Sequence, residues 1–277
     1  LDSWGLTEES CEIVASALQS SNSPLRELDL SYNNLGNSGV ELLCAGLKGP
    51  NCKLQRLGLV SCGIKKQSCE IVASALQSSN SPLIELDLSY NDLGDSGVEL
   101  LCAGLKSPNC KVQALGLGWC NLTEGCCDDL ASVLCSPHSE LRNLELRDND
   151  VQDSGVTALS AGLEDPHCKL QRLGLSGCQL TERGCESLAS ALCTNPSHLR
   201  ELDLSYNYPG DSGLRALSAA KLDTLTLLVG HGGESRNKPG PRKYGCKLTL
   251  DPNTVRKQLS LSEGEQEGDM ERGAATS

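Results

Sequence analysis

A short apolar pattern, LxxLxL, recurs at a fixed interval and constrains this chain more than any other feature. Alternating leucines predict a short strand whose leucines face a core, and the later spacing of Val40, Leu43 and Leu47 is typical of a helix. Each unit is therefore strand, turn and helix, and it must stack on its neighbours to bury its apolar face. The pattern begins every 29 residues, at Leu25, Leu54, Leu83, Val112, Leu141, Leu170 and Leu199.

Two kinds of unit alternate along the chain and produce a longer period of 58 residues. Residues 11–52 and 69–110 are identical at 38 of 42 positions, which indicates a recent duplication. The residue three after the last strand leucine separates the two kinds. It is Asn33, Asn91, Asn149 and Asn207 in one kind and Cys62, Cys120 and Cys178 in the other.

The segments LRELDLSYNNLG, LQRLGLVSCGI and ASALQSSNSP resemble leucine-rich repeats of the ribonuclease-inhibitor type. The resemblance implies an α/β solenoid, a horseshoe with a parallel concave sheet and outer helices. It covers residues 1–229: a partial first unit, seven full units and an atypical last strand. It also implies that Asn33 and its equivalents hydrogen-bond the turn backbone, with cysteine filling the same position in the other units.

Composition and charge narrow the classes of partner. Aromatic residues make up 3% of the chain and Phe is absent, so the core must consist mainly of Leu, Val, Ala and Cys. Residues 1–229 hold 16 Lys and Arg against 29 Asp and Glu, and the whole chain carries −12. An acidic body argues against nucleic acid, whose phosphates need a basic stripe, and favours neutral or basic protein partners. No apolar run approaches the ~18 residues of a membrane span, and no secretory signal is visible.

The 16 cysteines are expected to be reduced and to act as small apolar residues of the core. Fifteen follow the repeat. Equivalent cysteines lie two strands apart, roughly 10 Å, which exceeds the ~7 Å limit for a disulfide. Reduced thiols indicate the cytosol, so we expect a cytoplasmic protein. The four histidines are scattered and no C-x2-C pair occurs, so no metal site is expected.

No catalytic motif is found in the sequence. G-x-x-x-x-G-K-[ST], HExxH and GxSxG are all absent, so neither an enzyme nor a cofactor is expected. The carboxylates recur with the repeat and do not form one distinctive pair.

The strands offer a binding surface instead, because positions between the leucines point to the concave side. Ser31 and Ser89 are expected to be among these concave-side residues. There we expect an acidic column flanked by aromatic residues. Trp119 is the strongest single candidate, since Ser61 and Gly177 hold its equivalent positions. The alternative is a solvated polar face multiplied by duplication. The predicted protein-binding residues are Asp29, Tyr32, Asp87, Tyr90, Trp119, Glu145, Asp203 and Tyr206.

The repeat deteriorates after Pro209, which replaces a turn leucine. Residues 230–245, rich in Gly, Pro and charge, are predicted to be a linker. Residues 246–263 contain LTLDPNT and LSLSE, which resemble the start of a PRY–SPRY (B30.2) domain, a β-sandwich used for protein recognition. The resemblance stops there, and residues 264–277 are predicted to be a disordered tail.

Together, these features resemble NLR proteins of the kind expanded in fish, which are cytosolic nucleotide-binding and leucine-rich-repeat immune sensors. The resemblance implies ligand sensing or autoinhibition by the repeats, with nucleotide bound only by an upstream ATPase domain. Leu1 aligns with the third apolar residue of a strand, so a fragment or truncated product without function is one alternative. An inhibitor of a basic enzyme, similar to ribonuclease inhibitor, is another.

Overall fold

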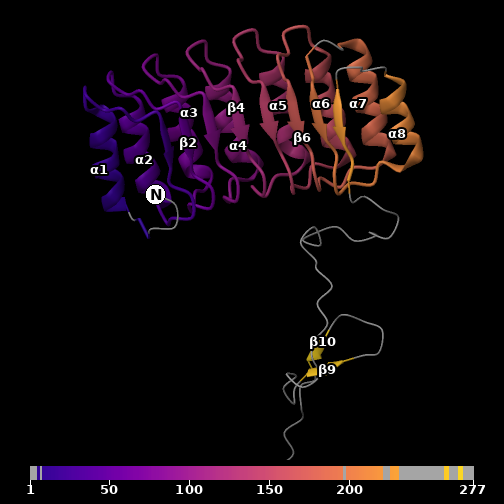
Figure 1. The fold of residues 1–277 in the computed structure, drawn as a ribbon, viewed down its shortest axis with the longest axis horizontal. Helices are drawn as coiled ribbons and strands as arrows, with labels where there is room; N and C mark the ends of the chain where they lie inside the picture. The colour runs from indigo at the N-terminus through magenta and orange to yellow at the C-terminus, as the bar shows by residue number, and fades with distance from the viewer. Residues whose placement is uncertain are drawn as a thin grey trace, which may run out of the picture. The chain divides into compact units, whose positions relative to one another are not determined.

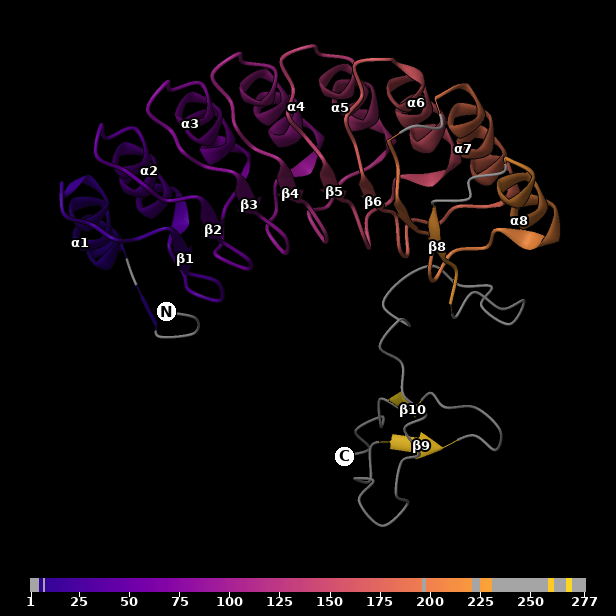
Figure 2. The same ribbon diagram turned by 45° about the horizontal axis from the view of Figure 1, so that its top comes forward.

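The computed structural model describes residues 5–6, 8–195, 198–220 and 225–230 together with two short strands near the C-terminus. The chain divides into two compact units, Leu1–Asn237 and Lys238–Ser277. The first unit holds the repeats, and its strands and helices alternate along an arc (Figures 1 and 2).

The first unit contains one parallel sheet of eight strands, ordered as they occur in the chain. The first seven strands pair in register with a 29-residue offset; for example, Leu57 lies opposite Leu86. The offset follows from the repeat, since each of these units has the same number of residues in its strand, turn and helix together. The strands are β1 Glu27–Asp29, β2 Arg56–Gly58, β3 Glu85–Asp87, β4 Ala114–Gly116, β5 Asn143–Glu145, β6 Arg172–Gly174, β7 Glu201–Asp203 and β8 Thr226–Leu228.

The helices line the outer side of the arc and the strands line its inner side (Figure 2). They are α1 Glu8–Gln19, α2 Gly36–Leu47, α3 Lys66–Leu76, α4 Gly94–Leu105, α5 Cys127–Leu134, α6 Gln152–Glu164, α7 Glu182–Thr194 and α8 Gly210–Ala219, with a 3-10 turn η1, Glu124–Cys126, before α5. The predicted leucine-rich-repeat solenoid is confirmed.

A single apolar layer between sheet and helices forms the core. Leu86 and Leu88 of one strand segment are buried, as are Val98 and Leu101 of the following helix. Helices approach closely where a glycine faces an alanine: a Cβ on Gly104 would lie 2.8 Å from the Ala73 Cα. The chain thus fills its core almost without aromatic residues, because short side chains suit the narrow space between successive units.

The alternating Asn and Cys residues tie neighbouring units together through backbone groups. Asn91 donates to the carbonyls of Leu59 and Leu88, both at 2.8 Å. Its side-chain oxygen accepts from the amides of Cys62 and Ile64 at 2.9 and 3.0 Å. In the next unit the Cys120 thiol donates to the Leu88 carbonyl at 3.3 Å. The turn role that the resemblance implied for asparagine and cysteine is confirmed.

Burial of the thiols has a chemical consequence. Thirteen of the fifteen described cysteines are buried. Burial raises the pKa of Cys44 and of Cys120 to about 12. Such thiols stay protonated near neutral pH and pack as small apolar groups.

The repeat loosens toward its end, as predicted. β8 pairs with β7, but Glu201 lies opposite Thr226, a 25-residue offset in place of 29. In the second unit, β9 (Leu259–Leu261) and β10 (Gly268–Met270) pair antiparallel. Most of the expected linker, the PRY-like segment and the tail lies outside the described residues, so those assignments stay predictions. None of the described helices is long and apolar enough to cross a membrane.

Candidate functional site

Two rows of side chains cross the concave face, one from the first and one from the last residue of each strand. Strand pairing in register places the members of each row side by side. The strand-start row contains Glu27, Arg56, Glu85, Ala114, Asn143, Arg172 and Glu201. The strand-end row contains Asp29, Gly58, Asp87, Gly116, Glu145, Gly174 and Asp203.

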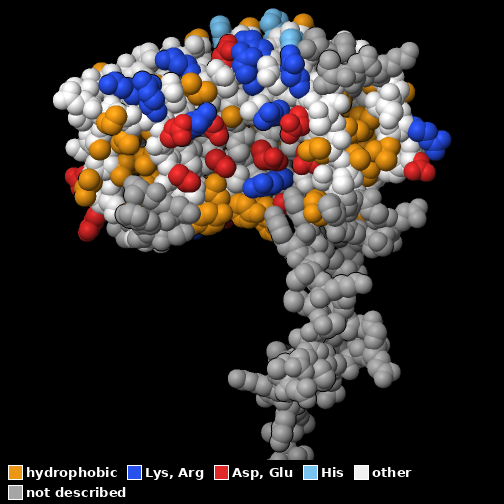
Figure 3. Space-filling view, viewed as in Figure 1, with side chains coloured by type: hydrophobic (Ala, Val, Ile, Leu, Met, Phe, Trp, Pro, Cys, Tyr) orange, Lys and Arg blue, Asp and Glu red, His pale blue; other side chains and the backbone are white. Residues whose placement is uncertain are grey.

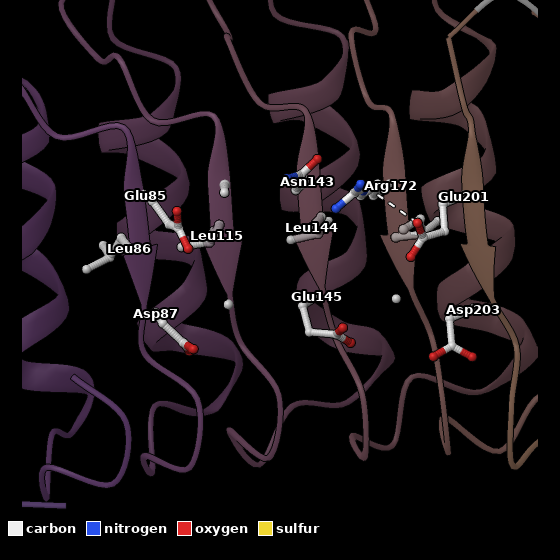
Figure 4. Close-up of a pocket in the computed structure, with 14 residues that line it drawn as sticks. Glu85, Leu86, Asp87, Leu115, Asn143, Leu144, Glu145, Arg172, Glu201 and Asp203 are labelled. Atoms are coloured by element: carbon white, nitrogen blue, oxygen red, sulfur yellow. Dashed lines mark ion pairs between the residues drawn. The ribbon is translucent and has the colours of Figure 1, made fainter. Parts of the chain in front are cut away.

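Charges in the strand-start row largely neutralise one another. Arg56 lies between two acids, with its nitrogens 2.7 Å from Glu27 and 3.1 Å from Glu85. Further along, Arg172 pairs with Glu201 at 3.5 Å (Figure 4). This row therefore has little unsatisfied charge to offer a partner.

The strand-end row is different, because acids alternate with glycines and no basic residue stands among them. Each of the first three carboxylates leans over the glycine of the next strand. The Asp29 Oδ1 atom would lie 2.7 Å from a Cβ on Gly58, and Asp87 and Glu145 would contact a Cβ on Gly116 and Gly174 still more closely. Among the described residues, Asp29, Asp87 and Asp203 form no ion pair.

These carboxylates also have a structural role. In each acidic unit one carboxylate oxygen accepts a hydrogen bond from the backbone amide two residues later. The amides of Ser31 and Ser89 donate to Asp29 and Asp87 at 3.0 and 2.9 Å. Those of Arg147 and Ser205 donate to Glu145 and Asp203 at 3.0 and 2.8 Å. Each acid therefore holds its turn with one oxygen.

A third row lies in the turns after the strands, where the predicted aromatic residues occur. Its members adopt positive φ, a region that favours glycine and costs an L-residue roughly 1–2 kcal/mol. The non-glycine members, with their φ angles, are Tyr32 (58°), Ser61 (53°), Tyr90 (61°), Trp119 (54°), Asp148 (55°) and Tyr206 (60°). Gly177, at 68°, occupies the same position in another unit.

Two of the four predicted aromatic residues meet. The rings of Tyr90 and Trp119 stack with centroids 5.7 Å apart and planes 9° from parallel. The guanidinium carbon of Arg147 lies 6.0 Å from the Tyr90 ring centroid. Both Trp119 Nε1 and Arg147 Nε are buried without a hydrogen-bond partner. The stack thus joins three successive units and holds two donors without acceptors.

The other two predicted aromatic residues are not part of the stack. Tyr32, which is 58% exposed, is separated from Tyr90 by Ser61, and Tyr206 is separated from Trp119 by Asp148 and Gly177 along the row. Arg147 was not among the predicted site residues. Its signal was available, because serine occupies its position at Ser31, Ser89 and Ser205.

Another expectation was wrong: Ser31 and Ser89 do not belong to the exposed face. Both are buried. Their hydroxyls accept from the amides of Val60 and Gly118, both at 3.1 Å. These serines link adjacent units.

A shallow cavity of about 280 Å³ lies over β3 to β7. Asp87, Glu145 and Asp203 line one side of it, and Glu85, Arg172 and Glu201 line the other (Figure 4). In the space-filling view, acidic side chains gather near the middle of the first unit's visible face, with basic side chains above and below them (Figure 3). Among the described residues, no group of three or more His, Cys, Asp and Glu could hold a metal ion.

Comparison with known proteins agrees with this geometry. A family model described as "Leucine Rich repeat" matches residues 21–44, 79–102, 140–160, 167–189 and 195–218. The described solenoid is a leucine-rich-repeat region.

The leucine-rich-repeat region is also similar to solved structures. One is TLR13 in a complex with ssRNA13: 17% identity, a TM-score of 0.41, and 78% of this chain against 30% of that one. Another is an internalin, InlF, from Listeria monocytogenes: 19% identity, a TM-score of 0.36, and 78% of this chain against 69% of that one. This chain thus spans less than a third of the TLR13 chain. None of the curated proteins compared with the chain matches it.

Proposed function

We propose that this chain is a non-catalytic protein-recognition module that binds its partner through the strand-end side of the concave sheet. The Tyr90–Trp119 stack, with Arg147 beside it, carries the proposal. Tyrosine, tryptophan and arginine are the residue types most enriched among those that dominate binding energy in protein interfaces. Here one of each comes together on three successive units.

The backbone of the aromatic row supports the same conclusion. Tyr90 and Trp119 hold a conformation that glycine adopts at Gly177 without strain. Bulky residues kept at a conformational cost are common at binding surfaces. Ser61 forms the same turn without a ring, so the turn itself requires neither Tyr90 nor Trp119.

The acidic carboxylates favour a basic protein surface over nucleic acid. Asp87 and Asp203 line the cavity and form no ion pair with any described residue. The basic side chains across the face are partly neutralised, as Arg56 and Arg172 show. A phosphate backbone needs free basic groups, whereas unpaired acids steer a basic partner.

We further propose that the chain acts in the cytoplasm as the ligand-sensing or regulatory leucine-rich-repeat region of an NLR-like innate immune receptor. The alternating repeat and the PRY-like residues 246–263 support this assignment. Buried, free thiols such as Cys62 and Cys120 suit a reducing compartment. Any nucleotide would be bound by an upstream ATPase domain.

Binding experiments with matched variants test the proposal. Trp119→Ser and Asp87→Lys are compared with Leu100→Ser, which removes an exposed apolar side chain from helix α4, away from the concave sheet. Partner proteins captured by the parent chain should be lost by the first two variants and kept by the third. If all three variants retain every captured partner equally, the concave face is not the binding surface.

One alternative has an observation in its favour. The acids of the strand-end row would suit a module that blocks a basic enzyme, in the manner of ribonuclease inhibitor. Inhibition assays against basic ribonucleases test this alternative: inhibition that Asp87→Lys abolishes would support it, and no inhibition by the parent chain would exclude that target class.

A further inference from the structure

The spacing of groups along the strand-end row restricts the shape of a partner segment. Acids stand on every second strand, and neighbouring strands lie ~4.8 Å apart, so successive acids are roughly 9.6 Å apart along the sheet. The cavity places three of them, Asp87, Glu145 and Asp203, along one side. Between them lie Gly116 and Gly174, which have no side chain and so leave room for the carboxylates of Asp87 and Glu145.

Three regular peptide conformations can be compared with this spacing. A polyproline II helix has three residues per turn and advances about 9.3 Å per turn, so every third side chain lies on one face. An α-helix returns to the same face after seven residues, about 10.5 Å. A β-strand presents side chains to one face every ~6.6 Å. Over two intervals between acids, the length of a polyproline II helix differs from the length of the row by less than ~1 Å.

The aromatic stack suits the same conformation. Trp119 follows β4, which lies between the strands that carry Asp87 and Glu145. Proline-rich segments in the polyproline II conformation dock on grooves lined by aromatic rings. The segment's carbonyls make no internal hydrogen bonds, and the buried Trp119 Nε1 has no acceptor.

We infer that the strand-end side of the concave sheet takes a polyproline II segment of a basic partner. Lys or Arg at every third residue faces Asp87, Glu145 and Asp203, and a proline packs on the Tyr90–Trp119 stack. This inference rests on the proposed function and specifies its partner.

The test uses the full chain and three labelled peptides in fluorescence anisotropy titrations. RPPRPPR has the required spacing and stiffness. PPRRRPP has the same composition with its arginines adjacent, and RGGRGGR has the same spacing without the stiff conformation. We expect RPPRPPR to bind at least about tenfold more tightly than either of the others, a factor that corresponds to ~1.4 kcal/mol. Equal binding of RPPRPPR and PPRRRPP, or no binding of RPPRPPR, would overturn the inference.

Matched variants separate specific contacts from bulk charge. The triple variant Asp87→Asn, Glu145→Gln, Asp203→Asn removes three charges but keeps an oxygen to accept each turn amide. The control triple, Glu41→Gln, Glu99→Gln and Glu186→Gln, removes three charges from exposed helix positions. We expect RPPRPPR affinity to fall by about tenfold or more in the first and less than about twofold in the second. Equal losses of RPPRPPR affinity in the two triple variants would mean that net charge alone accounts for binding, and would overturn the inference.

Two further measurements test the part of the Tyr90–Trp119 stack in binding. Trp4→Tyr leaves Trp119 as the only tryptophan, and its emission should change when RPPRPPR binds. Trp119→Ser should weaken RPPRPPR binding, and unchanged affinity would contradict the docking described here. If no peptide binds but protein capture still depends on Trp119, this inference fails and the proposed function stands. If capture does not depend on Trp119 or Asp87 either, both fail.

Discussion

The Tyr90 and Trp119 rings stack almost in parallel, with centroids 5.7 Å apart, although 29 residues separate them in the chain. The contact arises because equivalent turn positions of adjacent units are neighbours in space. Stacked aromatic pairs contribute about 0.5–1.5 kcal/mol beyond their buried area. A double-mutant cycle with Tyr90→Ser and Trp119→Ser should therefore show a coupling of about this size in the free energy of unfolding. Serine at Ser61 shows that the turn accepts these substitutions. A coupling near zero would mean that the rings do not stabilise one another.

The carboxylate of Asp87 occupies the space over Gly116, where a Cβ would clash with it. Gly116→Ala should lower the free energy of unfolding by about 1–3 kcal/mol, the usual cost of overpacking. The cost should shrink when Asp87→Ala is introduced as well, because the two closest atoms are then removed and only the Ser89 Oγ, 3.2 Å from the Cβ, stays near. Urea unfolding of the single and double variants measures both effects. An equal cost with and without Asp87 would show that the clash is not the cause.

Asn91 and Cys120 hold equivalent positions in the two kinds of unit, but their contacts differ in number. Asn91 makes hydrogen bonds to five backbone groups of two units. Each buried polar group left unsatisfied costs about 1–3 kcal/mol, so Asn91→Ala should destabilise the region by about 3 kcal/mol or more. Cys120→Ala should cost about 1–2 kcal/mol, since the thiol is a weak donor. Equal losses in urea unfolding would contradict this ranking.

The buried thiols make the region sensitive to alkaline pH. Burial raises the pKa of Cys44 from 9.0 to about 12. A raised pKa means that the folded state keeps a proton that the unfolded state loses. The free energy of unfolding should therefore fall as pH rises above 9.0 and continue to fall toward about 12. Urea midpoints at about pH 8 and about pH 10.5 measure the change.

Two variants assign this alkaline destabilisation to buried thiols. Cys44→Ala should reduce the fall between the two pH values, because one buried titrating group is gone. Cys193→Ser should leave it unchanged, since the Cys193 thiol is exposed. If both variants behave like the parent chain, the fall has another source, such as lysine titration.

Much of the fold could be predicted because the repeat makes each local signal recur. The alternation in segments such as Leu83–Leu88 predicted strands with buried leucines, and burial of Leu86 and Leu88 agrees. The predicted acids Asp29, Asp87, Glu145 and Asp203 end every second strand, as the 58-residue period implied. The partners and the burial of individual side chains could not be predicted. The hydrogen bonds from turn amides to these acids, the burial of Ser31 and the contact of Arg147 with Tyr90 depend on side-chain direction.

The sequence by itself determined the order of the units, the parallel sheet and the acids that end every second strand, because a strict 29-residue period places equivalent residues side by side. Only the tertiary structure decided which of those neighbours touch. Tyr90 meets Trp119 while Tyr32 stays exposed. Asp87 lies over Gly116, while Arg56 is held between Glu27 and Glu85. The reason is that contact between repeats depends on side-chain size and rotamer across a gap of about 4.8 Å, which periodicity alone does not specify.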